Sequence, residues 1–173
     1  KPGDYFVFEF GRAESVIILR NQAGEIKGFH NVCRHRASRL ARHHRDPAPP
    51  EADKLSVRQL GPAGNTPVFR CPYHAWTYDY QGRLIGAPHM DGSPGFRKED
   101  FPLNQVRAGV WDGHVFVCLS PSGPSLAEHL DGLPAKFAPW RMGDLTVAHR
   151  IVYDVRTNWK LIVQNYNECL HCP

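Results

Sequence analysis

Two short segments that each pair a cysteine with a histidine place the strongest constraint on this chain. Cys33 and His35 form a Cys-x-His motif, and Cys71 and His74 form a Cys-x-x-His motif. Thiolate and imidazole groups are side chains that bind soft and borderline transition metals. Because residues 36–70 separate the two motifs, the fold has to bring two distant loops together around one metal centre.

Both motifs follow stretches of strand character. Aromatic and β-branched residues dominate short runs that are separated by Gly, Asn and Asp turns, a pattern typical of antiparallel hairpins. The first 120 or so residues are therefore predicted to be mainly β. The expected strands are Tyr5–Phe10, Ser15–Arg20, Ile26–Val32, Val68–Arg70, Trp76–Tyr80, Arg83–Gly86, Phe101–Val110 and His114–Leu119.

Composition also predicts the domain organisation. A metal-binding β domain is expected over residues 1–122, with a surface insertion rich in Pro and Gly at about 42–67, where only Leu55–Leu60 could pair as a strand. A linker is expected at 123–144, with interrupted helical turns over 125–137. A second domain is expected to start at 145–173, with a strand over Leu145–Val155 and a helix over Trp159–Cys172. The chain is thus expected to be part of a longer protein.

The remaining histidines and cysteines of interest are given structural or surface roles. His43 and His44 have no matching ligand nearby and are interpreted as solvated loop side chains. Cys118 alternates with apolar residues and is expected in the core. Cys169 and Cys172 are expected to pack rather than to bind metal.

Two kinds of metal centre use two cysteines and two histidines. A Rieske [2Fe–2S] cluster takes both cysteines on one iron and both histidines on the other. A structural zinc ion can use the same set, but zinc fingers are very small modules that often place their histidines on a helix. Both loops here end β-strands of a large β domain, which favours the iron–sulfur cluster, with Cys33, His35, Cys71 and His74 as its ligands. Zinc is the alternative.

The residues around the two loops resemble one known family. Cys33 begins the sequence CRHRASRL, Cys71 begins CPYHAWTY, and QGRL follows at Gln81. These motifs are similar to those of the large (α) subunit of Rieske non-haem iron oxygenases, the ring-hydroxylating oxygenase superfamily. In two departures, Ala37 and Ala75 replace glycines that are usual in the family, and the loops lie about twice as far apart in the sequence. An alanine there is a mild change if φ is negative.

The end of the chain resembles the catalytic-domain signature of the same superfamily. Residues 158–160 have the sequence NWK and residues 164–173 have QNYNECLHCP, so that Gln164, Glu168 and His171 share one face of a helix. By this resemblance, His171 is the first histidine of a 2-His-1-carboxylate mononuclear Fe(II) site. The same resemblance implies that Glu168 is the catalytic bridge between that site and His74 of a neighbouring subunit. It also implies that the second histidine and the carboxylate ligand would lie beyond residue 173.

The resemblance implies the start of an α+β, helix-grip-like catalytic domain and the oxygenase component of a monooxygenase. Glu168 stands where ring dioxygenases usually have Asp, which favours the branch that oxidises, often by N-demethylation, a small quaternary ammonium compound such as glycine betaine, choline, carnitine or stachydrine. An aromatic ring-hydroxylating dioxygenase α subunit is one alternative. A Rieske ferredoxin that only carries electrons is the other.

The same resemblance implies the partners of such an enzyme. Electrons would come from NAD(P)H through a separate flavin and iron–sulfur reductase, since the chain has no dinucleotide-binding fingerprint. O2 would be the second substrate. The implied assembly is a homotrimer with electron transfer between subunits.

Bulk properties argue against several other classes of protein. The net charge is only +4, without a basic helix or an aromatic RNA-binding motif, so no nucleic-acid partner is expected. No apolar run approaches the ~18–20 residues that span a bilayer, and no signal peptide is visible. Five cysteines without a secretory context argue against a disulfide framework and favour a cytoplasmic location.

Overall fold

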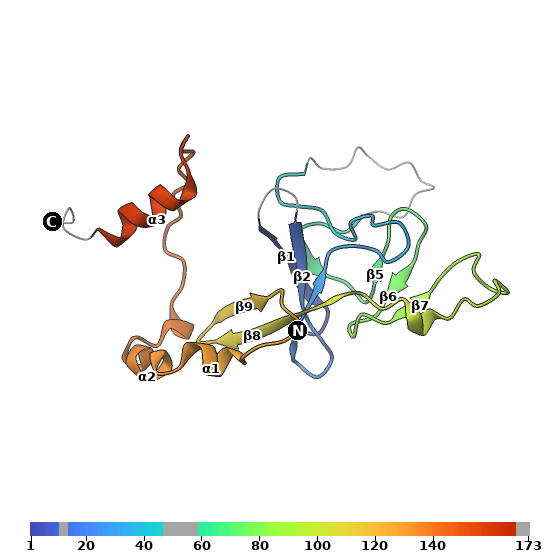
Figure 1. Ribbon diagram of the computed structural model, residues 1–173, viewed down its shortest axis with the longest axis horizontal. Helices are drawn as coiled ribbons and strands as arrows, with labels where there is room; N and C mark the ends of the chain where they lie inside the picture. The colour runs from blue at the N-terminus through green and yellow to red at the C-terminus, as the bar shows by residue number, and fades with distance from the viewer. Residues whose placement is uncertain (11–13, 47–58, 169–173) are drawn as a thin grey trace. The chain divides into compact units, whose positions relative to one another are not determined.

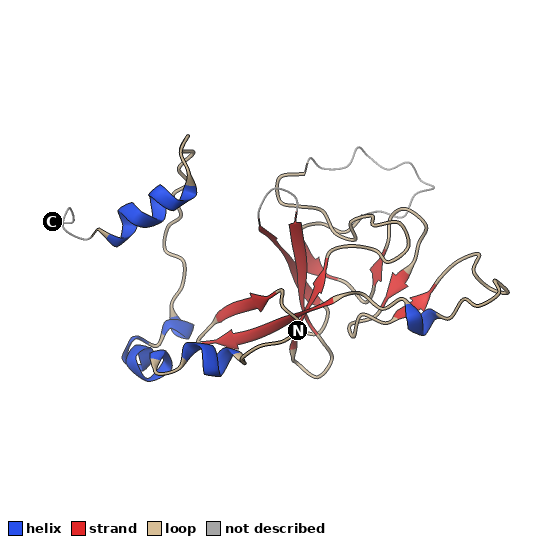
Figure 2. Ribbon diagram, viewed as in Figure 1, coloured by secondary structure: helices blue, strands red, loops and turns tan. Residues whose placement is uncertain are grey.

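The computed structural model describes residues 1–10, 14–46 and 59–168. Contacts within the chain divide it into two compact units, Lys1–Gly143 and Asp144–Pro173, called here the first and the second unit. Strands dominate the first unit, whereas its α-helices follow the last strand and a single 3₁₀ turn, Lys98–Asp100, precedes the last two strands (Figure 2). The predicted mainly β, antiparallel fold class is confirmed.

The larger sheet of the first unit has six strands in the order β4-β1-β2-β3-β8-β9, and every neighbouring pair is antiparallel (Figure 1). Its strands are β1 Asp4–Phe10, β2 Glu14–Arg20, β3 Ile26–His30, β4 Ala63–Asn65, β8 Gln105–Trp111 and β9 His114–Cys118. β4 is a short edge strand within the insertion at about 42–67, where only Leu55–Leu60 was expected to pair as a strand.

The central strand β2 is buried on both faces, which explains its run of apolar residues. Ile17 and Leu19 point into the main core, together with Val7 of β1, which pairs with Ile17. Val16 and Ile18 point to the opposite face, where they pack with a second, smaller cluster. Each fully buried side chain of this size stabilises the fold by about 1.5–3 kcal/mol. β2 therefore contributes buried side chains to the core clusters on both faces of the sheet.

A smaller sheet of three antiparallel strands lies against the main core. Its strands are β5 Phe69–Arg70, β6 Thr77–Tyr78 and β7 Leu84–Gly86. Phe69 and Tyr78 are directly paired and both are buried. The main core cluster contains Cys33 and Cys71 as well as residues from both sheets. The two predicted metal-binding loops thus start from one shared core.

The helical segment expected over 125–137 consists of two short helices, α1 Leu126–Leu130 and α2 Leu133–Phe137. Ser125 and Glu128 cap α1 reciprocally, which satisfies two backbone N–H groups that the helix leaves free. Gly132 and Pro134 separate the helices because Pro fits only the first turn of α2. Single-turn 3₁₀ segments lie at Lys98–Asp100, Ala138–Trp140 and Met142–Asp144.

The second unit differs from its predicted secondary structure. The helix α3 starts at Trp159, as expected, and is N-capped by Asn158. It ends at Asn167, so Glu168 lies after the helix and not within it as predicted. The predicted strand over Leu145–Val155 is also wrong. That stretch is irregular and exposed, with Val152 84% accessible. A strand needs a partner for its backbone groups, and none of the described residues provides one. The expected last turns of the helix, residues 169–172, lie outside the described residues.

Two predictions about individual side chains are also wrong. Cys118 is exposed rather than in the core, because it ends β9 at the edge of the sheet. His43 is only 9% accessible rather than solvated, since it packs against β1 and β2, whereas its neighbour His44 is exposed as expected. Of the predicted strand Leu55–Leu60, residues 55–58 lie outside the described residues, and Leu60 makes one isolated bridge to Ala41.

Within the described ranges, the structure has no helix that is long and apolar enough to cross a membrane.

Candidate metal centre

The two predicted ligand loops, residues 33–38 and 71–76, are built in the same way. In the first ligand loop, the Cys33 N–H donates to the carbonyl of Ser38 at 2.8 Å, and the Ala37 N–H donates back to Cys33 at 3.1 Å. In the second, the Cys71 N–H donates to Trp76 at 2.8 Å, and the Ala75 N–H donates back to Cys71 at 3.0 Å. Each loop is therefore a tight turn that closes on its own cysteine.

The closing bonds force an unusual backbone conformation at both alanines. Ala37 has φ of 55° and Ala75 has φ of 58°, in the left-handed region that glycine adopts freely. The expectation that these alanines are mild replacements depended on a negative φ and is wrong. For a residue with a Cβ atom, this conformation costs roughly 1–2 kcal/mol.

The cysteines of the two loops form a buried sulfur pair. Cys33 and Cys71 are each 2% accessible, and their side chains hydrogen-bond to each other. This shared proton raises the pKa of Cys33 and lowers the pKa of Cys71. A metal ion bound by both sulfurs would take the place of that proton.

The histidines of the two loops form an imidazole pair. The ring centroids of His35 and His74 lie 4.9 Å apart at an interplanar angle of 66°. His35 stacks on the buried Trp76 at 4.8 Å, and burial, followed by the nearby His74, lowers the pKa of His35. His74 is exposed and contacts the ring of Tyr73, which is 62% accessible. A neutral imidazole is the form that binds metal.

The buried hydroxyl of Tyr78 joins the sulfur pair to the backbone. Its oxygen lies 3.3 Å from Cys33 Sγ and accepts a hydrogen bond from the Arg34 N–H at 3.0 Å. Because a backbone N–H can only donate, the hydroxyl proton is left for the sulfur. Burial raises the pKa of Tyr78, so this proton stays in place. The sequence did not indicate this role, since Tyr78 lies 45 residues from Cys33.

A sulfur pair beside an imidazole pair fits the ligand set of a [2Fe–2S] cluster with one all-cysteine and one all-histidine iron. It fits a single zinc ion less well. Within the described residues, no three or more His, Cys, Asp or Glu side chains are gathered as the ligands of a single metal ion. The donor set thus favours two irons that share the four residues in pairs.

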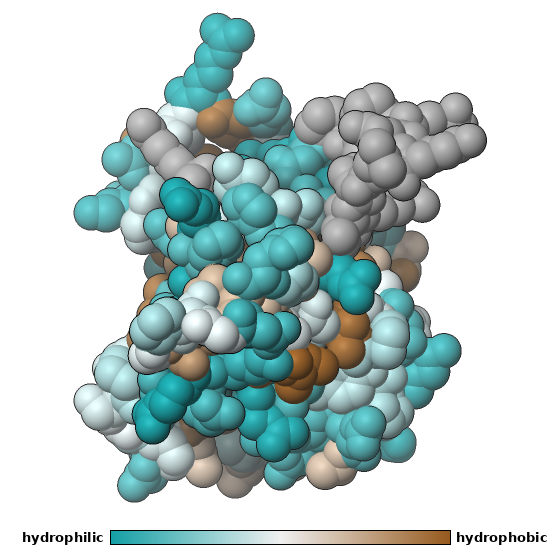
Figure 3. Space-filling model, turned by 90° about the vertical axis from the view of Figure 1, so that its right-hand side faces the viewer, coloured by the Kyte–Doolittle hydropathy of each residue, from teal (hydrophilic) through white to brown (hydrophobic). Residues whose placement is uncertain are grey.

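The surface at the end of the first unit that carries β7 is mainly hydrophilic. Figure 3 views the molecule from this end, and hydrophobic side chains gather there in only a small patch.

The residues predicted for the second metal site belong to the second unit. Glu168 is exposed and follows directly after α3, where its backbone N–H donates to Asn165 at 3.2 Å. His171 lies outside the described residues. The bridging role of Glu168 and the iron-binding role of His171 therefore stay predictions.

Comparison with known families agrees with the geometry of the loops. The family model described as Rieske [2Fe-2S] domain matches residues 1–106. The chain belongs to the Rieske [2Fe-2S] family. A second model, described as the catalytic domain of the ring hydroxylating alpha subunit, matches residues 142–173. Together, the two matches agree with the resemblance to ring-hydroxylating oxygenase α subunits that the motifs indicated. The two matched domains imply a Rieske cluster and a mononuclear iron.

Two of the curated relatives are named as oxygenase subunits of monooxygenases. The Rieske chain is 29% identical over 170 residues to the glycine betaine monooxygenase oxygenase subunit of Pseudomonas aeruginosa strain UCBPP-PA14, covering 98% of this chain and 35% of the relative. It is 33% identical over 161 residues to the carnitine monooxygenase oxygenase subunit of Escherichia coli strain K12, covering 92% of this chain and 38% of the relative. The chain therefore spans little more than a third of these proteins.

A solved structure is also similar to this chain. The crystal structure of the quaternary ammonium Rieske monooxygenase CntA in complex with L-carnitine matches with a TM-score of 0.80 and 29% identity. The match covers 99% of this Rieske chain and 44% of the CntA chain.

Proposed function

We propose that the full protein is the oxygenase component of a Rieske non-haem iron monooxygenase. The observation that carries the proposal is that one chain contains both the paired Cys and His loops of a Rieske domain and the start of a ring-hydroxylating catalytic domain. A ferredoxin that only carries electrons has no use for the second domain.

In this proposal, Cys33 and Cys71 bind one iron of the cluster, and His35 and His74 bind the other. When bound, a Rieske cluster supplies one-electron transfer. Tyr78 donates a hydrogen bond to the Cys33 sulfur, which disperses its negative charge and favours the reduced state. Trp76 covers His35, while the exposed His74 offers the route by which electrons enter or leave.

The second unit would receive the electrons in another subunit of a homotrimer. Glu168 would hold the contact with the partner's His74, and His171 would be the first histidine ligand of the mononuclear iron. The exposure of both Glu168 and His74 supports this role, because each is available to a second chain.

The substrate that we propose is a small quaternary ammonium compound, such as glycine betaine, choline, carnitine or stachydrine, which is oxidised by O2 and N-demethylated. Support comes from the glycine betaine and carnitine monooxygenase subunits among the relatives. Electrons would come from NAD(P)H through a separate flavin and iron–sulfur reductase in the cytoplasm.

The test is an assay of the full-length protein with a reductase, NADH and a panel of betaines. The expected result is formaldehyde release that requires O2 and reductase, together with three irons and two acid-labile sulfides per chain. Two irons per chain, without a third, would support a Rieske ferredoxin that only carries electrons. A colourless protein without a Rieske electron paramagnetic resonance (EPR) signal after reduction would favour zinc instead.

A further inference from the structure

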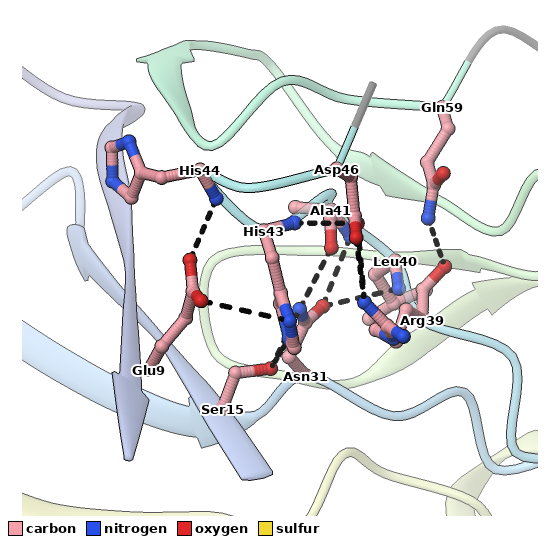
Figure 4. Close-up of polar contacts among 10 residues, drawn as sticks. All are labelled: Glu9, Ser15, Asn31, Arg39, Leu40, Ala41, His43, His44, Asp46 and Gln59. Atoms are coloured by element: carbon pink, nitrogen blue, oxygen red, sulfur yellow. Dashed lines mark hydrogen bonds and ion pairs between the residues drawn. The ribbon is translucent and has the colours of Figure 1, made fainter. Parts of the chain in front are cut away.

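A buried polar cluster closes the first ligand loop at its far end (Figure 4). Asn31, just after β3, is fully buried, and its amide oxygen accepts hydrogen bonds from the N–H groups of Leu40 and Ala41 at 3.1 and 2.9 Å. Its amide nitrogen donates to the Ala41 carbonyl at 2.8 Å and to Ser15 Oγ at 3.1 Å. Asn31 therefore ties together the two segments that flank the first ligand loop.

The direction of these bonds follows from the groups that face each other. Backbone N–H groups only donate, so the oxygen of Asn31 must face them and its nitrogen must donate to Ser15. Ser15 is buried as well, and its Oγ lies 2.8 Å from His43 Nε2. Ser15 Oγ already accepts the hydrogen bond from Asn31, and its own buried proton needs an acceptor. His43 Nε2 is that acceptor.

The other nitrogen of His43 agrees with this direction. A neutral imidazole that accepts at Nε2 carries its proton at Nδ1. Nδ1 lies 3.7 Å from Glu9 Oε2 on β1, so that the N–H faces a carboxylate. The second oxygen of Glu9, Oε1, accepts from the backbone N–H of His44 at 2.6 Å. The other carboxylate nearby, Asp46, accepts from the backbone N–H of His43 at 2.8 Å and not from its ring. Hydrogen bonds thus run in one direction, from Asn31 through Ser15 to His43.

We propose that His43 is a positioning residue for the first ligand loop. As the acceptor for Ser15, it orients the bond between Ser15 and Asn31, and Asn31 in turn fixes residues 40 and 41. Without the acceptor, the buried Ser15 hydroxyl has to turn towards another group and competes for the Asn31 amide. The proposal rests on the proposed function only in that this loop holds half of the cluster ligands.

The test compares three variants of the full-length protein with bound cluster: His43→Leu, which removes the acceptor; His43→Gln, whose amide oxygen can accept in its place; and His44→Leu, the exposed neighbour, as the control. The readouts are the EPR spectrum of the reduced cluster and hydrogen exchange of the peptide that contains Leu40 and Ala41. His43→Leu should shift the g values and speed exchange about tenfold, the loss of roughly one buried hydrogen bond. His43→Gln should restore both readouts, and His44→Leu should leave both unchanged.

The proposal is overturned if His43→Leu behaves like the His44→Leu control, or if His43→Gln shifts both readouts as far as His43→Leu. If His43→Leu does not fold, Ser15→Ala takes its place, because it removes the donor to the same nitrogen. It should produce the same shifts, and its failure to do so also overturns the proposal. A missing Rieske signal in the unmodified protein would refute the proposed function instead, while the exchange comparison would still decide the role of His43.

Discussion

Replacing Ala37 with glycine should make the protein more stable, although it shortens a side chain. Ala37 has φ of 55°, and a residue with a Cβ atom pays about 1–2 kcal/mol for that conformation. Glycine avoids this cost but loses about 0.4–1 kcal/mol through the greater freedom of the unfolded chain. The side chain of Ala37 is exposed, so little burial is lost. The difference predicts a gain of about 0.8 kcal/mol for Ala37→Gly.

The second loop offers an internal comparison. Ala75 has almost the same φ, 58°, but its methyl group is half-buried. Loss of this contact removes up to about 0.8 kcal/mol, so Ala75→Gly should be close to neutral. Ala23 lies in an exposed turn outside the positive-φ residues, and Ala23→Gly should therefore destabilise by about 0.4–1 kcal/mol.

Urea denaturation followed by tryptophan fluorescence measures these differences. With an m value of about 2 kcal/mol per molar, Ala37→Gly should raise the midpoint by about 0.4 M. A midpoint that falls as far as that of Ala23→Gly would show that the positive φ of Ala37 stores no strain, and the reasoning would fail.

Three further predictions concern the proposed metal centres. Tyr78→Phe removes the hydroxyl that donates to Cys33 Sγ and should lower the reduction potential in a redox titration. Tyr80→Phe, whose hydroxyl donates to Thr66 instead, should not change it, and equal potentials in both variants would refute the role of Tyr78. Glu168→Gln should leave both metal sites loaded yet slow product formation by orders of magnitude; near-normal turnover would disprove the bridge, and Asp154→Asn is the exposed acidic control. Removal of the cluster by a chelator should lower the thermal midpoint by about 5 °C or more, because the ligand loops lose their shared metal. An unchanged midpoint would mean that the loops are rigid without it.

Local sequence patterns predicted most strands and the ligand loops, but not the features that depend on distant residues. The apolar run of β2 predicted a strand correctly, and the structure buries this strand on both faces. Leu145–Val155 has a similar pattern without a partner strand in the described residues, and it forms none. A pattern of side chains indicates strand character, whereas pairing depends on the rest of the fold.

The same distinction applies within the candidate site. The spacing of the Cys and His residues was visible in the sequence, but the positive φ of Ala37 follows from hydrogen bonds that close the loop. Tyr78 reaches Cys33 only because the small sheet brings it there. The burial of His43 depends on Glu9 and on Ser15, which precede it by about 30 residues. None of these contacts has a local signature.

The bridge between Ala41 and Leu60 has a practical consequence for the segment between the two ligand loops. The Arg42 N–H donates to the Leu60 carbonyl at 2.9 Å. The two ends of the segment are therefore paired with each other, and this pairing is called here the base of the segment. Once such a base is held, doubling the length of the enclosed segment costs only about 0.6 kcal/mol in closure entropy. The distance in sequence between the two ligand loops can therefore vary widely among related proteins while the cluster ligands keep their places.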